Sequence, residues 1–324
     1  MRLAGLVSTT AKKRAFALEA PSLPRIIFVL GKGGVGRSTV SAALGSALAA
    51  RGERVLVLQW AVADSIGPWF GKPAAGQDPV EVRPGVSVAN FSLEDSLRAY
   101  FVDHLRLGML YRRVIHAGPV WRLIEVSPGI AEIFFLGELW WLINLAEKEA
   151  GLRFDRIVVD APATGHGASL LDVPGALKAM GASGMMGREV DRVVALMKDP
   201  ALTGAVVVSL PEPLVMAETV ELVPRITDRF GRAPLALLIN RSATALADAS
   251  PPPGWLQTLA LTPAARQTVQ TVADELRVRA QLEAELSGSL ARQTTLGCFS
   301  VPELLGLGPV EVIDALTAEL GGAR

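Results

Sequence analysis

A run of glycines, basic residues and hydroxyl residues at positions 31–39 is the part of this sequence best suited to chemistry. Its order is Gly-Lys-Gly-Gly-Val-Gly-Arg-Ser-Thr, close to the G-x-x-x-x-G-K-[ST] pattern of phosphate-binding loops. Glycines let successive backbone N–H groups turn toward phosphate oxygens, and the start of the following helix adds its positive dipole end. The predicted nucleotide-binding residues are Gly31, Lys32, Gly33, Gly34, Val35, Gly36, Arg37, Ser38 and Thr39.

The loop departs from the general pattern at one position. Arg37 stands where the pattern has lysine. An arginine keeps the positive charge at the phosphate but does not reproduce the compact contact of a lysine ammonium group. The loop therefore predicts phosphate binding with an altered cationic contact.

A second motif, at residues 160–167, reads Asp-Ala-Pro-Ala-Thr-Gly-His-Gly. A carboxylate that closes a buried strand beside a phosphate loop is placed to hold the shell of a magnesium ion, while a hydroxyl of the loop binds the metal directly. We therefore predict Ser38 and Asp160 as metal ligands, and Arg37 and Asp160 as catalytic residues. Pro162 and Gly165 make the following loop a candidate switch that senses the terminal phosphate.

The elements around these motifs predict an α/β fold. Residues 25–30 form a short apolar run, and residues 38–50 carry Ala and Leu at helical spacing before Gly52 ends the helix. Further strand-like runs lie at 54–58, 156–160, 205–210 and 235–240. Their nearly continuous apolar character is typical of parallel strands buried on both faces. The expected architecture is a mostly parallel sheet flanked by helices, with its ligand crevice at the carboxyl ends of the strands.

The remaining segments define the expected domain organisation. Residues 1–24 indicate an N-terminal tail, and residues 25–324 a single domain built around the phosphate-binding loop. Within it, residues from about 91 to 152 are expected to form a helical cap. A linker at 251–254 precedes a mostly helical region at about 255–324.

Composition narrows the class of protein. Lys and Arg number 32, as do Asp and Glu, so the formal net charge is zero, and we expect no nucleic-acid partner. The single cysteine, Cys298, rules out an intramolecular disulfide and a paired-cysteine metal site, and we expect a cytoplasmic protein. The apolar segment 129–145 is interrupted by Glu132 and Glu138, which favours a core helix or a partner-binding face over a transmembrane segment.

Several motifs together carry a resemblance to a known family. Lys32, just after the first glycine, resembles the early lysine of the deviant Walker A loop found in MinD, ParA, nitrogenase iron protein and the arsenite-pump and tail-anchored-protein-targeting ATPases. Residues 160–166 are similar to the D-[TA]-[AP]-P-T-G-H motif of the last two, residues 128–132 to their P-G-x-x-E segment, and residues 211–219 to their P-E-x…E-T stretch. Over residues 24–243 the sequence is identified as a member of this arsenite-pump type of P-loop NTPase.

The resemblance implies a dimeric ATPase that binds ATP with Mg²⁺ and closes on it. In such proteins the early lysine reaches the partner's nucleotide, so the resemblance implies that Lys32 is a catalytic residue that acts across a dimer interface. Asn240 stands where the family has its adenine-contacting asparagine, and we expect Asn240 and Pro211 to contribute to the nucleotide site.

The sequence departs from the family after the second strand. The family has a T-D-P-A-H switch whose aspartate positions the attacking water, whereas residues 59–64 read Gln-Trp-Ala-Val-Ala-Asp. Ala61 occupies the place of that aspartate, and Asp64, three residues later, is an alternative carboxylate. We expect nucleotide binding to survive better than hydrolysis.

These features leave three hypotheses for function. The first is a nucleotide-dependent switch, slow or degenerate in hydrolysis, working as a homodimer or as a heterodimer with a homologous ATPase chain. The second is a nucleotide-locked module whose cap, with Trp140 and Trp141, binds a protein. The third is a client-targeting ATPase that uses the apolar helix as a groove. Arsenite binding and a zinc clamp in this family use cysteine clusters that one cysteine cannot supply.

Overall fold

The computed structural model describes most of the chain, namely residues 23–104, 109, 111, 121, 122, 124, 127, 129–162, 164–179, 181, 183–243, 254–294 and 296–321. Nearly all of the expected N-terminal tail and residues 251–253 of the expected linker lie outside the described residues.

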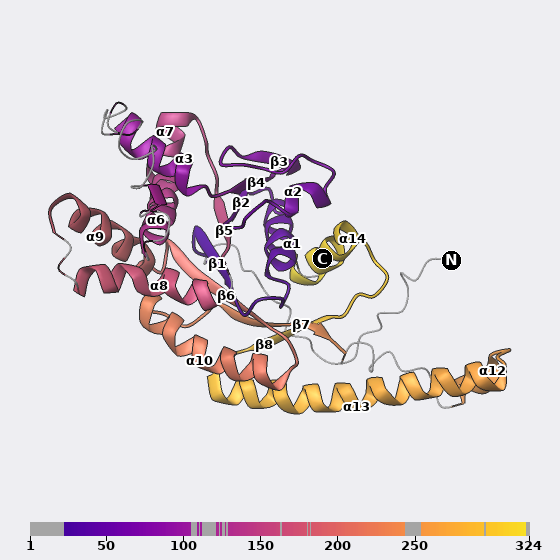
Figure 1. Cartoon of the computed structure of the whole chain (residues 1–324). Coiled ribbons are helices and arrows are strands. Elements are labelled where there is room, and N and C mark those ends of the chain that lie inside the picture. Colours follow the sequence, from indigo (N-terminus) through magenta and orange to yellow (C-terminus); the bar gives the residue numbers. More distant parts are fainter. Residues whose placement is uncertain are drawn as a thin grey trace.

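An eight-stranded sheet forms the centre of the molecule (Figure 1). The strands lie in the order β3-β4-β2-β5-β1-β6-β7-β8, and all neighbours pair in parallel except β3 and β4. In chain order they are β1 (Ile26–Leu30), β2 (Val55–Gln59), β3 (Val80–Arg83), β4 (Val86–Asn90), β5 (Arg156–Asp160), β6 (Thr203–Ser209), β7 (Ala236–Ser242) and β8 (Cys298–Pro302).

Helices cover both faces of the sheet, as a parallel sheet requires. The helices are α1 (Arg37–Ala49), α2 (Ile66–Trp69), α3 (Leu93–Arg98), the π-helical turn η2 (Ala99–His104), α6 (Ile130–Asn144), α7 (Ala146–Ala150), α8 (Thr164–Ala179), α9 (Gly184–Lys198), α10 (Pro213–Phe230), α12 (Trp255–Thr258), α13 (Pro263–Thr294) and α14 (Pro309–Gly321).

Successive side chains of β1 point to opposite faces of the sheet, and each face has its own hydrophobic core. Phe28 points into a core shared with helices α6, α8, α9 and α10, whereas Ile27 and Val29 point into a core shared with α1 and α14. Every residue of β1, and of β2, is buried. The apolar runs in the sequence therefore reflect strands covered on both sides, as predicted.

Three strands were not predicted. β3 and β4 form an antiparallel pair at one edge, and β8 joins β7 at the other edge inside the region expected to be mostly helical. These strands alternate partly exposed residues with buried ones, so they lack the continuous apolar run that marks the central strands.

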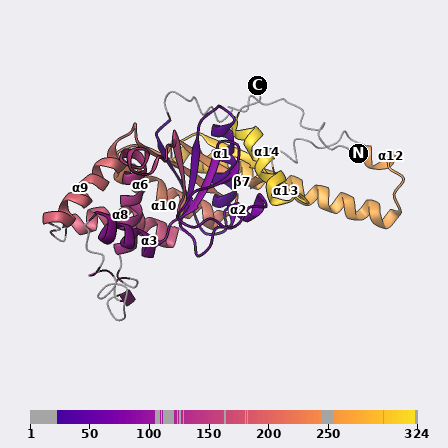
Figure 2. The ribbon, with the colours of Figure 1, turned by 90° about the horizontal axis from the view of Figure 1, so that it is seen from above.

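The described part of the expected cap is helical and consists mainly of α3, η2, α6 and α7. The amino-terminal part of α13, together with α12, projects away from the sheet in both views (Figures 1 and 2). No helix within the described residues combines the length and apolar character needed to cross a membrane.

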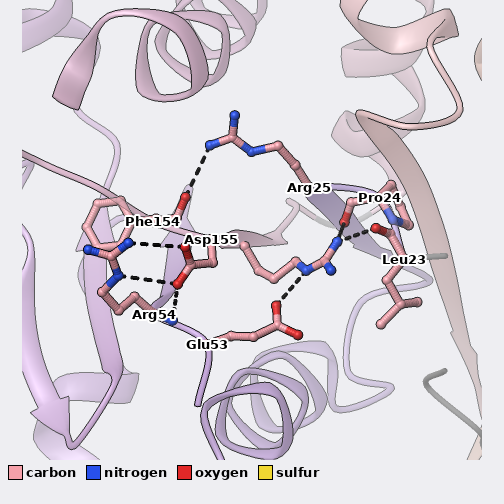
Figure 3. A network of polar contacts seen from close by, with 8 residues as sticks. Leu23, Pro24, Arg25, Glu53, Arg54, Phe154 and Asp155 are labelled. Carbon is pink, nitrogen blue, oxygen red and sulfur yellow. Dashed lines mark hydrogen bonds and ion pairs between the residues drawn. The ribbon is translucent and has the colours of Figure 1, made fainter. Parts of the chain in front are cut away.

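Ion pairs fasten the amino-terminal edge of the sheet (Figure 3). Arg156 binds Glu53 at 2.6 Å and also donates to the carbonyl oxygens of Leu23 and Pro24. Arg54 pairs with Asp155 at 3.1 Å. These contacts join the starts of β1, β2 and β5, and the sequence motifs lie at the opposite, carboxyl ends of these strands.

Candidate functional site

The glycine loop lies between the carboxyl end of β1 and the start of α1. β1 pairs with β5 on one side and with β6 on the other, so the loop emerges between their ends. Gly33 and Gly34 are exposed, while Val35 is fully buried and anchors the loop in the core. The backbone of these two glycines is thus exposed, while the buried Val35 side chain fixes the loop to the core.

Helix α1 begins directly behind this loop. Gly36 is its N-cap residue with φ 93°, a left-handed conformation that favours glycine, and no acidic residue lies in the first turn. Arg37, Ser38 and Thr39 form that first turn. A thirteen-residue helix that starts here directs unpaired backbone N–H groups and its positive dipole end toward the loop.

Asp160, at the end of β5, forms the polar centre of the site. It is 6% exposed, and its carboxylate bonds to Gln59 Nε2 at 2.9 Å, to Ser41 Oγ at 3.4 Å and to the Ser38 side chain. Burial raises the pKa of Asp160 above its ordinary value, although these hydrogen bonds and the nearby Arg37 charge act in the opposite direction.

Arg37 reaches from α1 to the loop that follows β5. Its Nη1 donates to the carbonyl oxygen of Ala161 at 2.7 Å. Burial lowers the pKa of the Arg37 guanidinium, and the Asp160 carboxylate counteracts this effect. Arg37 therefore links the glycine loop to the candidate switch after β5. The side chains of Thr164 and His166 in that switch are not among those that the structure describes.

Lys32 has a partner within its own chain. Its Nζ lies 2.6 Å from Glu218 Oε1 on α10, and both side chains remain partly exposed, at 32% and 41%. In the single chain, the lysine that was expected to act across a dimer interface thus forms an ion pair with a carboxylate of its own chain.

Asn240 lies against the glycine loop. Its Nδ2 donates to the Val35 carbonyl oxygen at 2.8 Å, and a Cβ on Gly36 would lie only 2.3 Å from the same nitrogen. Pro211 follows β6, which pairs with β7, so both residues lie at the same edge of the sheet. Asn240 therefore supports the loop directly, and contact with adenine stays a prediction for both residues.

The loop after β2 is the region where the sequence departs from the expected pattern. Asp64 is 5% exposed and accepts hydrogen bonds from the backbone N–H groups of Ile66, Gly67 and Ala75. Its carboxylate is therefore engaged in fixing the turn into α2. A catalytic role for Asp64 in place of the family's switch aspartate stays a prediction.

Ala61 itself is exposed and held by Asn90. Asn90 Oδ1 accepts from the Ala61 N–H at 3.1 Å, and its Nδ2 donates to the Ala61 carbonyl oxygen at 3.0 Å. The backbone here is fixed by a side chain from the neighbouring strand β4, and no carboxylate projects from position 61.

Four residues of this site were not among the predicted ones: Ser41, Gln59, Asn90 and Glu218. Gln59 gives a sequence signal, since it is a polar residue at the end of an apolar strand. Asn90 gives none, because strand β4 itself was not predicted. Glu218 was part of a matched motif, but its contact with Lys32 depends on how α10 packs beside the loop.

The fold and this site define the chain as a P-loop nucleotide-binding protein, with a glycine loop between β1 and α1 and a buried aspartate at the end of the adjacent strand. The profile of the ArsA ATPase family, described as anion-transporting ATPases, matches residues 24–185, which is half of the chain. The chain therefore belongs to the ArsA ATPase family.

Individual relatives agree with this membership. ATPase BagA of Mycobacterium tuberculosis is 29% identical over 227 residues, which cover 68% of this chain and 66% of BagA. An arsenical pump-driving ATPase of Acidiphilium multivorum is 33% identical over 48% of this chain and 26% of its own length. The ATPase ASNA1 homolog 2 of Paramecium tetraurelia is 27% identical over 65% of this chain and 73% of its own. The match thus spans just under two thirds of BagA and about a quarter of the pump ATPase.

Proposed function

We propose that this protein is an ATP-binding switch that hydrolyses ATP slowly. The exposed glycine backbone, the start of α1 and Arg37 supply the phosphate site. The proposal of slow hydrolysis rests on the loop after β2. The Asp64 carboxylate accepts hydrogen bonds from three backbone N–H groups, and position 61 has no carboxylate. Loss of one group that positions a reactant commonly costs about 10²-fold in rate.

The residues present fit a magnesium ion of the kind that nucleotides bring. The Ser38 hydroxyl and the Asp160 carboxylate are already hydrogen-bonded to each other, so two hard oxygen ligands converge beside the phosphate loop. We assign the direct contact to Ser38 and the outer contact to Asp160. Bound magnesium would neutralise charge on the terminal phosphates.

We also propose that the protein works as a dimer, either of two copies of this chain or with a homologous ATPase chain. Lys32 lies at the leading edge of the loop and is held by Glu218, away from the phosphate-binding helix start. In the dimer, Lys32 leaves Glu218 and contacts the nucleotide of the partner. Light scattering with and without a non-hydrolysable ATP analogue should show a nucleotide-dependent increase in mass, and Lys32→Ala should reduce it while nearly preserving nucleotide affinity. A nucleotide-saturated protein that stays monomeric at every concentration would refute this arrangement.

Calorimetric titration with Mg-ATP tests binding. The informative variant is Gly34→Asn, because asparagine tolerates the positive φ of 85° and no protein atom lies within 4 Å of the Cβ position. The variant should fold but lose ATP binding, since its side chain takes the space above the loop. Gly52→Asn is the matched control, with φ 89° and equal freedom at the far end of α1. No binding by the unmodified protein would overturn the proposal.

Single-turnover hydrolysis distinguishes the slow switch from a module that merely holds ATP. A slow but measurable conversion of bound ATP that depends on Asp160 supports the switch. If bound ATP persists unchanged, the nucleotide serves as a structural ligand instead.

A further inference from the structure

A large cavity lies between one side of the sheet and the helices of the cap. Its volume is about 970 Å³, at the upper end of the range of about 300–1,000 Å³ typical of small-molecule sites. Strands β2 and β4 form its floor, and α3, α6, α7 and α9 contribute to its walls. The cavity lies on the side of β2 that faces α6, and none of the glycine-loop residues lines it.

The walls of this cap cavity are rich in aromatic side chains. Five of them line it: Phe91, Tyr100, Phe134, Trp140 and Trp141. Aromatic faces favour apolar molecules, and they also attract organic cations through the ring quadrupole. The Trp140 ring already shows this preference, because the Arg192 guanidinium lies 5.1 Å from its centre.

A carboxyl group projects into this apolar surrounding from the middle of α6. Glu138 lines the cavity, and its hydrogen-bond partners are the neutral side chains of Gln77, at 3.4 Å, and Ser96. No ion pair to Glu138 is found among the described residues. Burial raises the pKa of Glu138 to about 7, so the protein holds an acid without supplying its counter-ion.

The remaining charges of the cavity are also mainly acidic. Its carboxyl groups are Asp78, Asp95, Glu138, Glu149 and Glu189, and its basic groups are Arg98 and Arg192. Arg192 pairs with Glu189 at 2.8 Å, and Glu149 accepts a hydrogen bond from Trp141 Nε1 at 2.8 Å. With Glu189 paired to Arg192, four carboxyl groups, Glu138 among them, are left against one basic group, Arg98, which favours a ligand with positive charge.

We propose that the cap cavity binds a small organic amine with a large apolar body, whose protonated nitrogen is the counter-ion of Glu138. The apolar body fills the space between the aromatic side chains and the floor formed by Leu56 and Leu58. This site is separate from the phosphate loop, and the proposal does not depend on ATP binding or hydrolysis.

Three probes that share a naphthalene body and differ in one group test the charge preference: 1-naphthylmethylamine, 1-naphthylmethanol and 1-naphthoic acid. In calorimetric titrations of the full chain at pH 8, the amine should bind at least tenfold more tightly than the alcohol, and the acid most weakly. Because the amine stays protonated while Glu138 titrates near pH 7, its affinity should fall between pH 8 and pH 6. The affinity of the alcohol should stay nearly constant over the same range.

Two variants locate the site. Glu138→Gln keeps the shape of the side chain and should reduce the affinity for the amine to that for the alcohol. Gly137→Leu should weaken both probes at least tenfold, because Gly137 lines the cavity and no atom lies within 4 Å of the Cβ position, so the new side chain fills the space. Gly175→Leu, on the exposed surface of α8 and outside the cavity, is the matched control and should bind both probes normally.

Several outcomes would overturn the proposal. They are equal affinity for the amine and the alcohol, tighter binding of the acid, no binding of any probe at millimolar concentration, or binding of the amine that survives both cavity variants. Thermal unfolding of each variant shows whether it is folded. If Gly137→Leu proves unstable, Glu138→Gln with the three probes still decides the question.

Discussion

The loops that follow β1 and β2 lie at the same edge of the sheet but use their polar groups differently. After β1, glycine backbone is exposed and Arg37 and Ser38 surround a buried aspartate. After β2, the Asp64 carboxylate binds the backbone of its own turn, and Asn90 holds Ala61. If the Asp64 carboxylate moved toward a nucleotide, the backbone N–H groups of its own turn would lose their acceptor. This difference supports the proposal that the chain binds nucleotide but hydrolyses it slowly.

The largest effect is expected from Gly36→Ala. Its Cβ would lie 2.3 Å from Asn240 Nδ2, at a residue with φ 93°, so the loop must change shape and ATP affinity should fall at least 100-fold. Gly52→Ala, at φ 89° with no atom within 4 Å, should lose only about 1 kcal/mol of unfolding free energy and bind ATP normally. Titration calorimetry and thermal unfolding compare the two. Equal ATP affinity in both variants would contradict the role of the loop.

A gain of function is expected from restoring the family residues. The double variant Arg37→Lys with Ala61→Asp should raise single-turnover hydrolysis by roughly 10²-fold, since it supplies a positioning carboxylate and the compact cation. The single variants separate the two contributions. Rapid hydrolysis by the unmodified protein would contradict the proposal that the loop after β2 lacks a group needed for the reaction.

A loss of stability without a loss of rate is expected from Asp64→Ala. Removing the carboxylate leaves the N–H groups of Ile66, Gly67 and Ala75 without their acceptor. We expect the free energy of unfolding to fall by about 1–3 kcal/mol, while turnover per folded molecule stays the same. Denaturant unfolding measures the first quantity and single-turnover hydrolysis the second. A fall in turnover larger than the folded fraction explains would assign Asp64 a direct part in the reaction.

The smallest effect is expected from Glu218→Gln. The ion pair with Lys32 is partly exposed, and such pairs contribute about 0.2–1 kcal/mol. Releasing Lys32 should therefore strengthen nucleotide-dependent dimerisation by only about two- to fivefold, measured by sedimentation. Arg192→Gln, which breaks a surface ion pair on α9, serves as a control and should leave dimerisation unchanged. Weaker dimerisation in Glu218→Gln would show that the pair supports the dimer.

The sequence was most informative where a local pattern determines the structure. The buried runs of β1, β2 and β5 predicted a parallel sheet, and the position of the glycine loop between a strand and a helix was correct, because both follow from periodicity and from glycine conformations. The neighbours of Lys32, Asp64 and Ala61 could not be predicted in the same way. Glu218, Ala75 and Asn90 reach them only through tertiary packing or through the unpredicted strand β4.

Helix α14 adds a constraint on the order of folding. Ile313, Leu316 and Leu320 are buried in the core beside α1, and Thr317 Oγ1 donates to the Ala43 carbonyl oxygen at 3.3 Å. The outer surface of the helix behind the phosphate loop is thus covered by residues that the ribosome adds more than 250 positions later. During synthesis, the loop and the first turn of α1 emerge early but remain on an incompletely packed helix. Firm nucleotide binding is therefore expected only after α14 has been made.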